Sequence, residues 1–362
     1  MIGPPTEPLF EPRFGLQVDR TSGLAKLGRW RRIGPTHDDN TMSSEIVTGE
    51  EWHRLAEHEI FLVDRPTDAV IFNILGPARA ENGDASAATA IDAAITSHLP
   101  LAELISTLAA QSTERHAAFT RVLDVRIWPP TFVVAIAGGI ASGKTVTAKL
   151  LAAILCASGD VEVDVVSTDG FLFSNAELDH RNLTERKGFP ESFDHDGLIR
   201  FLAAIKSGQR DVIAPVYDHA RYDVVHDRHQ TIDRCDILII EGVNVLQAAL
   251  IPAGPRIDGK GLLVSDFVDL SVYLDADEVD LHDWFVARLR QLRRETANDD
   301  ASFFANFNSF SEADFAAMGE MVWQTINRPN LIEHIAPTRH RADLIVEKSA
   351  DHTVRLVTLR RR

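Results

Sequence analysis

Residues 138–145 (GGIASGKT) constrain the fold more than any other part of the chain. They match the phosphate-binding pattern G-x-x-x-x-G-K-[ST] at every fixed position. The preceding run, 131–137 (TFVVAIA), is typical of a buried strand, and Val146, Leu150 and Leu151 follow at helical spacing. The alternative, a chance glycine-rich turn, does not account for both flanks. The sequence therefore predicts a strand, a loop and a helix that together bind a nucleotide.

The residue types in this loop suit that chemistry. Gly138 and Gly143 let the backbone curl so that successive N–H groups point at phosphate oxygens, and the helix N-terminus adds its positive end. Lys144 can reach the β- and γ-phosphates, and the Thr145 hydroxyl is placed to hold Mg²⁺. We expect the nucleotide to be bound by Gly138, Gly139, Ile140, Ala141, Ser142, Gly143, Lys144, Thr145 and Val146.

Composition narrows the class of protein. The net charge of −16 argues against a nucleic-acid partner, because phosphate backbones select basic surfaces. Two cysteines, Cys156 and Cys235, are too few for a disulfide framework or a zinc site. No apolar run approaches the roughly 20 residues of a membrane span, and the first residues lack the layout of a signal peptide. A cytoplasmic enzyme without a membrane segment is expected.

Three regions follow from the pattern along the chain. Residues 1–40 are rich in Gly, Pro and polar residues without sustained periodicity, which predicts a poorly ordered tail. A helical N-terminal layer is expected over 41–125, followed by the nucleotide core over 126–362. The layer is predicted to contain a helical stretch over 43–64, a loop over 76–88 and a helix over 89–118.

Four further apolar runs in the core indicate strands, at 161–167, 236–240, 268–274 and 342–347. Near-continuous apolar strands separated by helices predict a parallel sheet covered on both faces. Ligands of such sheets bind beyond the carboxyl ends of the strands. Asp169 and Glu241 each follow one of these runs, so both are expected at the edge that carries the phosphate loop.

Three side chains are candidates for phosphoryl-transfer chemistry. Asp169 is positioned to accept a proton from a substrate hydroxyl, although a turn or N-cap aspartate is an alternative. Glu241 is expected to assist Mg²⁺, directly or through water, with a capping carboxylate as the alternative. Arg288 lies on a predicted helix over 278–297 with several arginines, of which one could stabilise the transferring phosphoryl group while the others are solvated.

Two segments mix basic, aromatic and turn residues, 186–194 (RKGFPESFD) and 215–223 (PVYDHARYD). Taken alone, the aromatic residues of the second could be ordinary loop residues. With GGIASGKT, STDGFLFSN, DILIIEGVNVLQ, VSDFVDLSVYLDA and INRPNLIEHIAPTRHRADLI, however, these segments resemble the bacterial type I pantothenate kinases. That family is related to uridine kinase and phosphoribulokinase. The matching pieces occur in family order from about residue 130 to the end of the chain.

The resemblance implies a P-loop NTPase three-layer α/β fold with a mostly parallel central sheet, and a homodimer. It implies phosphorylation of the primary hydroxyl of pantothenate by ATP with Mg²⁺, the first step to coenzyme A. By position, Lys144 and Thr145 hold the triphosphate and Mg²⁺, Asp169 is the base and Arg288 the transition-state arginine. The positions that contact pantothenate, or the inhibitor overlapping its site, are Tyr217, His219, Tyr222, Phe285 and Asn330.

The chain also departs from the family pattern. Phe285 stands where the family commonly has a tyrosine, which removes a hydroxyl that could face the substrate. Lys149 replaces a common arginine and cannot reproduce its bidentate grip on phosphate. The phenylalanines that commonly sandwich the thiol end of coenzyme A, the family's feedback inhibitor, are replaced by Leu289, Leu292 and Ala297. These changes predict weakened feedback inhibition by coenzyme A.

Other functions stay open on the sequence. A paralogous kinase could act on a pantothenate analogue, a nucleoside or a sugar phosphate, although its relatives among uridine kinases lack these segments in this form. A nucleotide-dependent switch or coenzyme A sensor without turnover belongs to another class. A guanine-nucleotide switch lacks support because no N-K-x-D motif is present, and a degenerate sensor is expected to have lost Lys144 or Asp169.

Overall fold

The computed structural model of the chain describes residues 44–57, 63–75, 84–124, 129–157, 159, 161–247 and 262–360, with the backbone alone at 84–87. The tail expected over 1–40 lies outside these residues. The boundary predicted near residue 126 between an N-terminal layer and a core stays a prediction.

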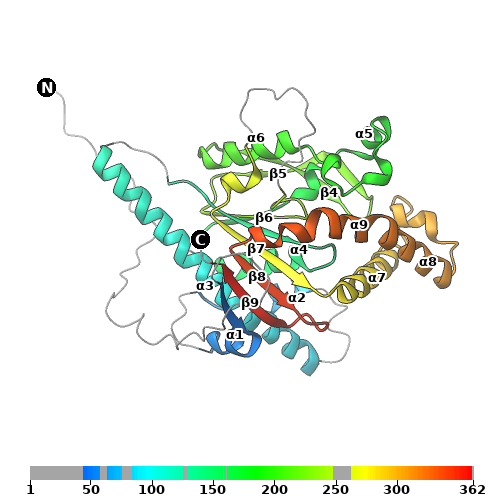
Figure 1. Cartoon of the computed structure of the whole chain (residues 1–362), viewed down its shortest axis with the longest axis horizontal. Helices are drawn as coiled ribbons and strands as arrows, with labels where there is room; N and C mark the ends of the chain where they lie inside the picture. Colours follow the sequence, from blue (N-terminus) through cyan, green and yellow to red (C-terminus); the bar gives the residue numbers. More distant parts are fainter. Residues whose placement is uncertain are drawn as a thin grey trace.

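A seven-stranded sheet forms the centre of the molecule, in the order β1-β9-β8-β7-β2-β6-β3 (Figure 1). Its five parallel strands are β2 (Phe132–Gly138), β3 (Val163–Ser167), β6 (Ile237–Glu241), β7 (Leu270–Ala276) and β8 (Leu344–Lys348). All five coincide with the predicted apolar runs, because strands buried on both faces have to be apolar nearly throughout. The mostly parallel α/β fold expected from the sequence is confirmed.

Two antiparallel strands at one edge complete this sheet. β1 (Ser44–Thr48) pairs with β9 (Val354–Arg360), and β9 pairs with β8. The helical prediction for 43–64 is therefore wrong at its start, where β1 supplies partners to the backbone groups of β9. Helix begins only at α1 (Gly49–Leu55), whose N-cap Thr48 exchanges hydrogen bonds with Glu51. Local periodicity cannot predict a pairing between strands that are this distant in sequence.

Helices α1, α2 (Asp68–Leu75), α3 (Asp84–Leu123) and α4 (Lys144–Leu155) lie at one face of the sheet. Leu101 and Ile105 of α3 are buried, and they share a core with Val134 of β2. The helix predicted over 89–118 is confirmed. The loop prediction over 76–88 is wrong from residue 84, where α3 already begins.

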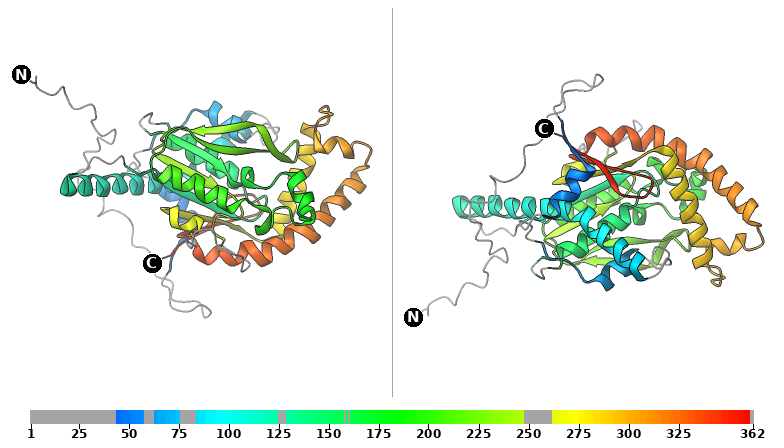
Figure 2. Two further views of the ribbon diagram at one scale, coloured as in Figure 1. Left: turned by 90° about the horizontal axis from the view of Figure 1, so that it is seen from above. Right: turned by 90° about the horizontal axis from the view of Figure 1, so that it is seen from below.

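The opposite face is covered by α6 (His195–Lys206), α7 (Glu278–Glu295) and a long helical run that starts with α8 (Glu312–Val322) and includes α9 (Arg328–Asn330). Side chains of these helices pack on the alternate residues of the same strands, as two-sided burial requires. Figure 2 shows the helix–sheet body between the projecting end of α3 and the α7–α8 end.

The far half of α3 projects from this body (Figures 1 and 2). Phe119, Val122 and Leu123 are exposed there. Within the described residues, the segment Ala88–Leu123 is the one helix long and apolar enough to cross a membrane by length and composition. Its other half, however, is anchored in the core through Leu101 and Ile105.

A separate hairpin of β4 (Val212–Asp218) and β5 (Asp223–Ile232) lies beside the carboxyl edge of the sheet. It packs against the short helical turn η2 (Thr168–Phe171) that follows β3. The contact is close, because a Cβ added to Gly170 would lie 2.1 Å from the carbonyl oxygen of Pro215. The hairpin thus carries the 215–223 segment next to Asp169. The short helix α5 (Asn175–His180) follows η2.

Candidate active site

The phosphate loop has the predicted form: β2 ends at Gly138, and α4 begins at Lys144. The backbone between them is left-handed at Ala141 (φ 61°) and at Gly143 (φ 87°). At Gly138 a Cβ would lie 2.5 Å from the carbonyl oxygen of Leu274, so only glycine fits there. This curl sets successive N–H groups at the helix N-terminus, which makes an anion site.

Lys144 lies below the surface of this loop with 9 % of its area exposed. Its Nζ donates to the carbonyl oxygen of Gly139 at 2.8 Å. Burial lowers the pKa of Lys144, while the carboxylates of Glu241 and Asp169 oppose that shift. Two acidic groups therefore face the loop lysine, as the sequence predicted from their places at strand ends.

Asp169 and Glu241 are two carboxyl groups close enough for the charge of Asp169 to act on Glu241. Burial raises the pKa of Asp169, and the ammonium groups of Lys144 and Lys187 act in the opposite direction. Burial first, and then the charge of Asp169, raises the pKa of Glu241, which is 3 % exposed. A carboxyl with a raised pKa is suited to take up a proton during a reaction.

Thr145 and Glu241 offer oxygen ligands side by side, with Thr145 Oγ1 donating to Glu241 Oε1 at 2.9 Å. Across the described residues, no group of three or more His, Cys, Asp or Glu side chains is arranged to hold a metal. The Thr145 hydroxyl and the Glu241 carboxylate are oxygen donors of the kind that Mg²⁺ takes, one or two from the protein together with phosphates and waters. The residues present therefore suit Mg²⁺ bound together with a nucleotide.

Three aromatic residues of the hairpin, Tyr217, His219 and Tyr222, form a cluster near Asp169. We call it the acceptor cluster, because the sequence predicts that these residues bind the phosphoryl acceptor. The Tyr217 ring meets those of His219 and Tyr222 edge-on, at centroid distances of 5.1 Å and 6.3 Å. Tyr222 has a left-handed backbone (φ 54°), an uncommon conformation for a bulky residue and one found at functional sites. The structure thus brings together three of the predicted acceptor residues.

Lys187 is a member of this cluster that the sequence argument missed. Its Nζ donates to Asn175 Oδ1 and to the carbonyl oxygen of Tyr222, both at 2.6 Å. The ammonium also lies over the rings of Tyr222 and Tyr217, 4.0 Å and 5.1 Å from their centroids. Burial lowers its pKa to about 8, although the carboxylates of Asp223 and Asp169 oppose the shift. The KGFPES motif contained the signal, but only the fold shows which of its residues faces Asp169.

Phe303 is the second residue that the sequence argument missed. Its ring stacks on Tyr222 with a centroid distance of 4.8 Å. Two hydrogen bonds to the carbonyl oxygen of Ala220 hold this segment, from Phe303 N at 2.8 Å and from Ser302 Oγ at 3.0 Å. Phe303 is the first residue of the turn η6 (Phe303–Phe307). The ring of Phe307, in the same turn, packs edge-on against that of Phe303.

Asn330 lies at the end of α9, between two π-helical turns. Its Nδ2 donates to the carbonyl oxygen of Gly188 at 2.7 Å, which places it against the segment that carries Lys187. Its Oδ1 is buried without a hydrogen-bond partner in the described part of the chain. A buried acceptor of this kind is satisfied by a ligand or water. Phe285 is 7 % exposed and lies against the Trp323 ring, with centroids 5.8 Å apart.

Arg288 and Lys149 lie at exposed positions on α7 and α4. Both side chains act on the pKa of His219, a residue that is exposed at the surface. Partial desolvation of its ring is the main cause of the lowered pKa. Arg288 and then Lys149 lower that pKa further, while Glu241 raises it. The charges of Arg288 and Lys149 thus act on His219, a predicted substrate-binding residue.

The three positions expected to affect coenzyme A binding differ in their surroundings. Leu289 packs toward Gly319 of α8, and Leu292 is half-buried on α7. Ala297 lies beyond the end of α7 and is exposed. Each provides little surface on which a ring could stack, whereas Phe303 and its neighbours supply rings from the following turn.

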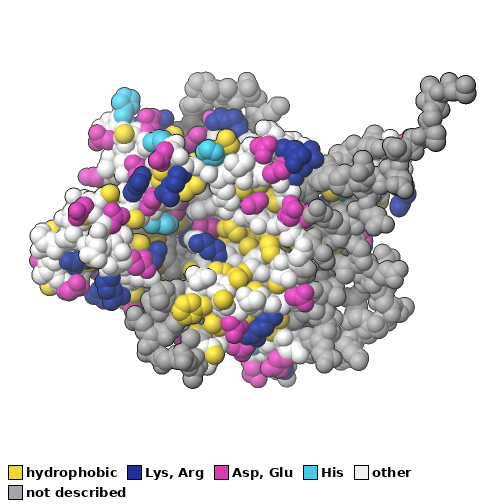
Figure 3. Space-filling view, turned by 180° about the vertical axis from the view of Figure 1, so that it is seen from behind, with side chains coloured by type: hydrophobic (Ala, Val, Ile, Leu, Met, Phe, Trp, Pro, Cys, Tyr) yellow, Lys and Arg dark blue, Asp and Glu magenta, His cyan; other side chains and the backbone are white. Residues whose placement is uncertain are grey.

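One face of the molecule carries charged side chains of both signs (Figure 3). In Figure 3, Lys and Arg side chains lie among Asp and Glu on the described part of this face and do not gather into a single basic patch.

Comparison with known proteins identifies close relatives. Residues 133–298 match the model of the Phosphoribulokinase / Uridine kinase family. The pantothenate kinase of Rhizobium rhizogenes (strain K84) is 49 % identical over 232 residues, which cover 64 % of this chain and 69 % of that protein. The pantothenate kinase of Rhodopseudomonas palustris (strain BisA53) is 43 % identical over 266 residues, covering 73 % of this chain and 82 % of that protein.

Proposed function

The chain belongs to the pantothenate kinase family, and we propose that it transfers the γ-phosphoryl group of Mg-ATP to the primary hydroxyl of pantothenate, the first step of coenzyme A biosynthesis. One observation supports this most directly. The ammonium groups of Lys144 and Lys187, one from the phosphate loop and one from the acceptor cluster, both act on the Asp169 carboxyl. A base in that position serves the donor and the acceptor at once.

In this proposal Asp169 accepts the proton of the hydroxyl as its oxygen attacks the γ-phosphorus, and the bond from that phosphorus to the β,γ-bridging oxygen breaks, which releases ADP. Lys144 neutralises the phosphates, and Arg288 offsets charge that develops on the transferring group. Phosphoryl transfer depends mainly on such positioning and electrostatics. Bound Mg²⁺ would be held by Thr145 and Glu241, and it would supply positive charge to the phosphate oxygens.

The acceptor would lie against the aromatic cluster. Tyr217, His219 and Tyr222 line it from the hairpin, and Asn330 offers its unpaired Oδ1 to an amide or hydroxyl donor. Lys187 would attract the carboxylate or the reacting oxygen of the acceptor. These contacts support a small, polar, anionic substrate, because each wall carries at least one hydrogen-bonding group.

Three further expectations belong to the same proposal. The exposed apolar end of α3, with Phe119 and Val122, supports a homodimer formed through that helix. Its other half is buried in the core, which supports a cytoplasmic protein rather than a membrane-anchored one. Leu289, Leu292 and Ala297 offer poor stacking surfaces, which supports weak feedback inhibition by coenzyme A.

The test is ADP release by the purified protein with Mg-ATP, comparing pantothenate, pantetheine and uridine as acceptors, each with and without coenzyme A. Turnover with the pantothenate-type acceptors alone is the expected result. Turnover with uridine, or nucleotide binding without turnover on any acceptor, would reject the proposal in favour of another kinase or a sensor. An inhibition constant for coenzyme A as tight as that of a relative with the phenylalanines would reject the inhibition part alone.

A further inference from the structure

The phosphate loop turns its N–H groups outward, so some of its carbonyl groups point into the protein. Buried carbonyl oxygens need donors, because an unpaired one costs about as much as a lost hydrogen bond. The Gly139 oxygen accepts from Lys144 at 2.8 Å. The Ser142 oxygen accepts from a lysine distant in sequence, Lys348, whose Nζ lies 3.1 Å away.

Lys348 is the last residue of β8 and is 7 % exposed. Its Nζ lies directly beneath the loop, since a Cβ added to Gly143 would come within 3.1 Å of it. Gly143 is the N-cap of α4, where the helix already has its positive end. A buried ammonium beside that end is unfavourable by itself, but it becomes favourable when an anion occupies the loop.

The ammonium is oriented by a chain of directed hydrogen bonds. Lys348 Nζ also contacts Thr147 Oγ1 at 3.4 Å, and Thr147 Oγ1 lies 3.2 Å from His98 Nε2. His98 Nδ1 lies 2.7 Å from the carbonyl oxygen of Ala94, so Nδ1 carries the hydrogen and Nε2 accepts from Thr147. Burial, and then the charge of Lys348, lowers the pKa of His98 to about 4, which keeps the ring neutral.

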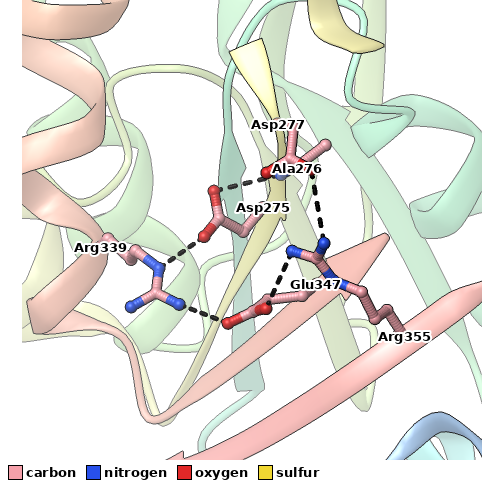
Figure 4. Close-up of polar contacts among 6 residues, drawn as sticks. All are labelled: Asp275, Ala276, Asp277, Arg339, Glu347 and Arg355. Atoms are coloured by element: carbon pink, nitrogen blue, oxygen red, sulfur yellow. Dashed lines mark hydrogen bonds and ion pairs between the residues drawn. The ribbon is translucent and has the colours of Figure 1, made fainter. Parts of the chain in front are cut away.

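The end of β8 that carries Lys348 is held in place by an ion-pair network (Figure 4). Arg339 pairs with Asp275 at 2.6 Å and with Glu347 Oε1 at 2.7 Å, and Arg355 takes Glu347 Oε2 at 3.3 Å. Arg355 also reaches Asp277 at 3.4 Å. Both oxygens of Glu347 are therefore paired with arginines. The next residue, Lys348, directs its ammonium group to the phosphate loop.

We propose that Lys348 is a positioning residue for nucleotide binding, which fixes the phosphate loop through the Ser142 carbonyl and adds positive charge beneath the phosphates. His98 and Thr147 hold the ammonium in that orientation and connect the loop to α3. The inference rests on the proposed function only in that the loop binds a nucleotide. It is independent of the acceptor.

The test measures the dissociation constant of Mg-ADP by calorimetry, without an acceptor, for the full-length protein and three variants. Lys348→Met keeps the aliphatic stem and removes the charge and the donor, so we expect Mg-ADP to bind about 10-fold more weakly or worse. Thr147→Val keeps the shape and breaks the link to His98, and we expect a change of about 2- to 5-fold in the same direction. The KM for pantothenate should stay within about twofold of wild type in both variants.

Lys206→Met is the matched control. Lys206 Nζ also donates to a backbone carbonyl, that of Thr131 at 2.9 Å, and pairs with Asp269, but this contact lies at the amino ends of β2 and β7, the ends opposite the phosphate loop. The control is expected to lower the melting temperature and leave Mg-ADP affinity unchanged. Unchanged affinity in folded Lys348→Met, or in Thr147→Val should the first variant not fold, overturns the inference. Wild-type binding of Mg-ADP without turnover on pantothenate would instead reject only the proposed function.

Discussion

Lys187 Nζ lies 4.0 Å from the centroid of the Tyr222 ring and donates to the carbonyl oxygen of the same residue at 2.6 Å. One ammonium thus fixes both the ring and the left-handed backbone of Tyr222. Because the same group, together with Lys144, acts on the Asp169 carboxyl, Lys187 influences both the shape of the acceptor cluster and the pKa of the proposed base.

We expect Lys187→Met to lower kcat/KM for pantothenate by about 10- to 100-fold, because a charge-assisted hydrogen bond and a cation–π contact are lost together. The affinity for Mg-ADP should change little, since Lys187 does not contact the phosphate loop. Steady-state kinetics and calorimetry on one preparation separate the two effects. An equal loss of Mg-ADP affinity would show that the residue supports the whole site rather than the acceptor.

The same lysine predicts a dependence of stability on pH. Its pKa is about 8 in the folded protein, against an ordinary value of 10.5. Between these values the unfolded chain binds more protons, so the free energy of unfolding rises with pH across that window. The wild type should therefore gain stability relative to Lys187→Met between pH 8 and 10.5. Urea unfolding of both proteins at several pH values measures this, and a constant difference would contradict it.

Asp169→Asn is expected to lower kcat by about 10²- to 10⁴-fold, the range for loss of a general base. Mg-ADP should still bind, because the loop and Lys144 are unchanged. The raised pKa of Asp169 also predicts that kcat/KM rises with pH on an acidic limb above the ordinary aspartate value, since the base must be ionised. Wild-type turnover in the variant would remove Asp169 from this role.

The local sequence pattern was sufficient to predict the nucleotide-binding half of the site. The strand, loop and helix around Lys144 are contiguous, and Asp169 and Glu241 follow buried strands, so their meeting at one edge is a consequence of parallel topology. The antiparallel edge of the sheet could not be predicted in this way, because β1 is defined by its pairing with β9, which is distant in sequence.

The acceptor half depends on contacts distant in sequence. Lys187 and Tyr222 are 35 residues apart, and Ser302 contacts Ala220 across 82 residues. Which residue of the KGFPES motif faces the base is decided by how this segment packs against the hairpin and α9. Similarly, Lys348 reaches the phosphate loop only because β8 ends beneath it.

Gly170, the residue after the proposed base, lies directly against the backbone of the hairpin. A Cβ on Gly170 would lie 2.1 Å from the Pro215 carbonyl oxygen and 2.8 Å from its carbon, so Gly170→Ala has to push the hairpin away from η2. We expect a loss of about 2–3 kcal/mol in the free energy of unfolding, typical of overpacking. The acceptor KM should rise as well, since Tyr217 and Tyr222 move with the hairpin.

Gly159→Ala provides the control for losing a glycine without a clash. Its Cβ would meet nothing within 4 Å among the described residues, and its φ of 77° costs about 1 kcal/mol for a non-glycine residue. Urea unfolding and pantothenate kinetics on both variants separate strain from displacement. The expected result is a raised acceptor KM in Gly170→Ala alone. Equal stability losses with unchanged kinetics in both would mean that the hairpin does not set the acceptor geometry, because only the Gly170 substitution displaces β4 from the turn that carries Asp169.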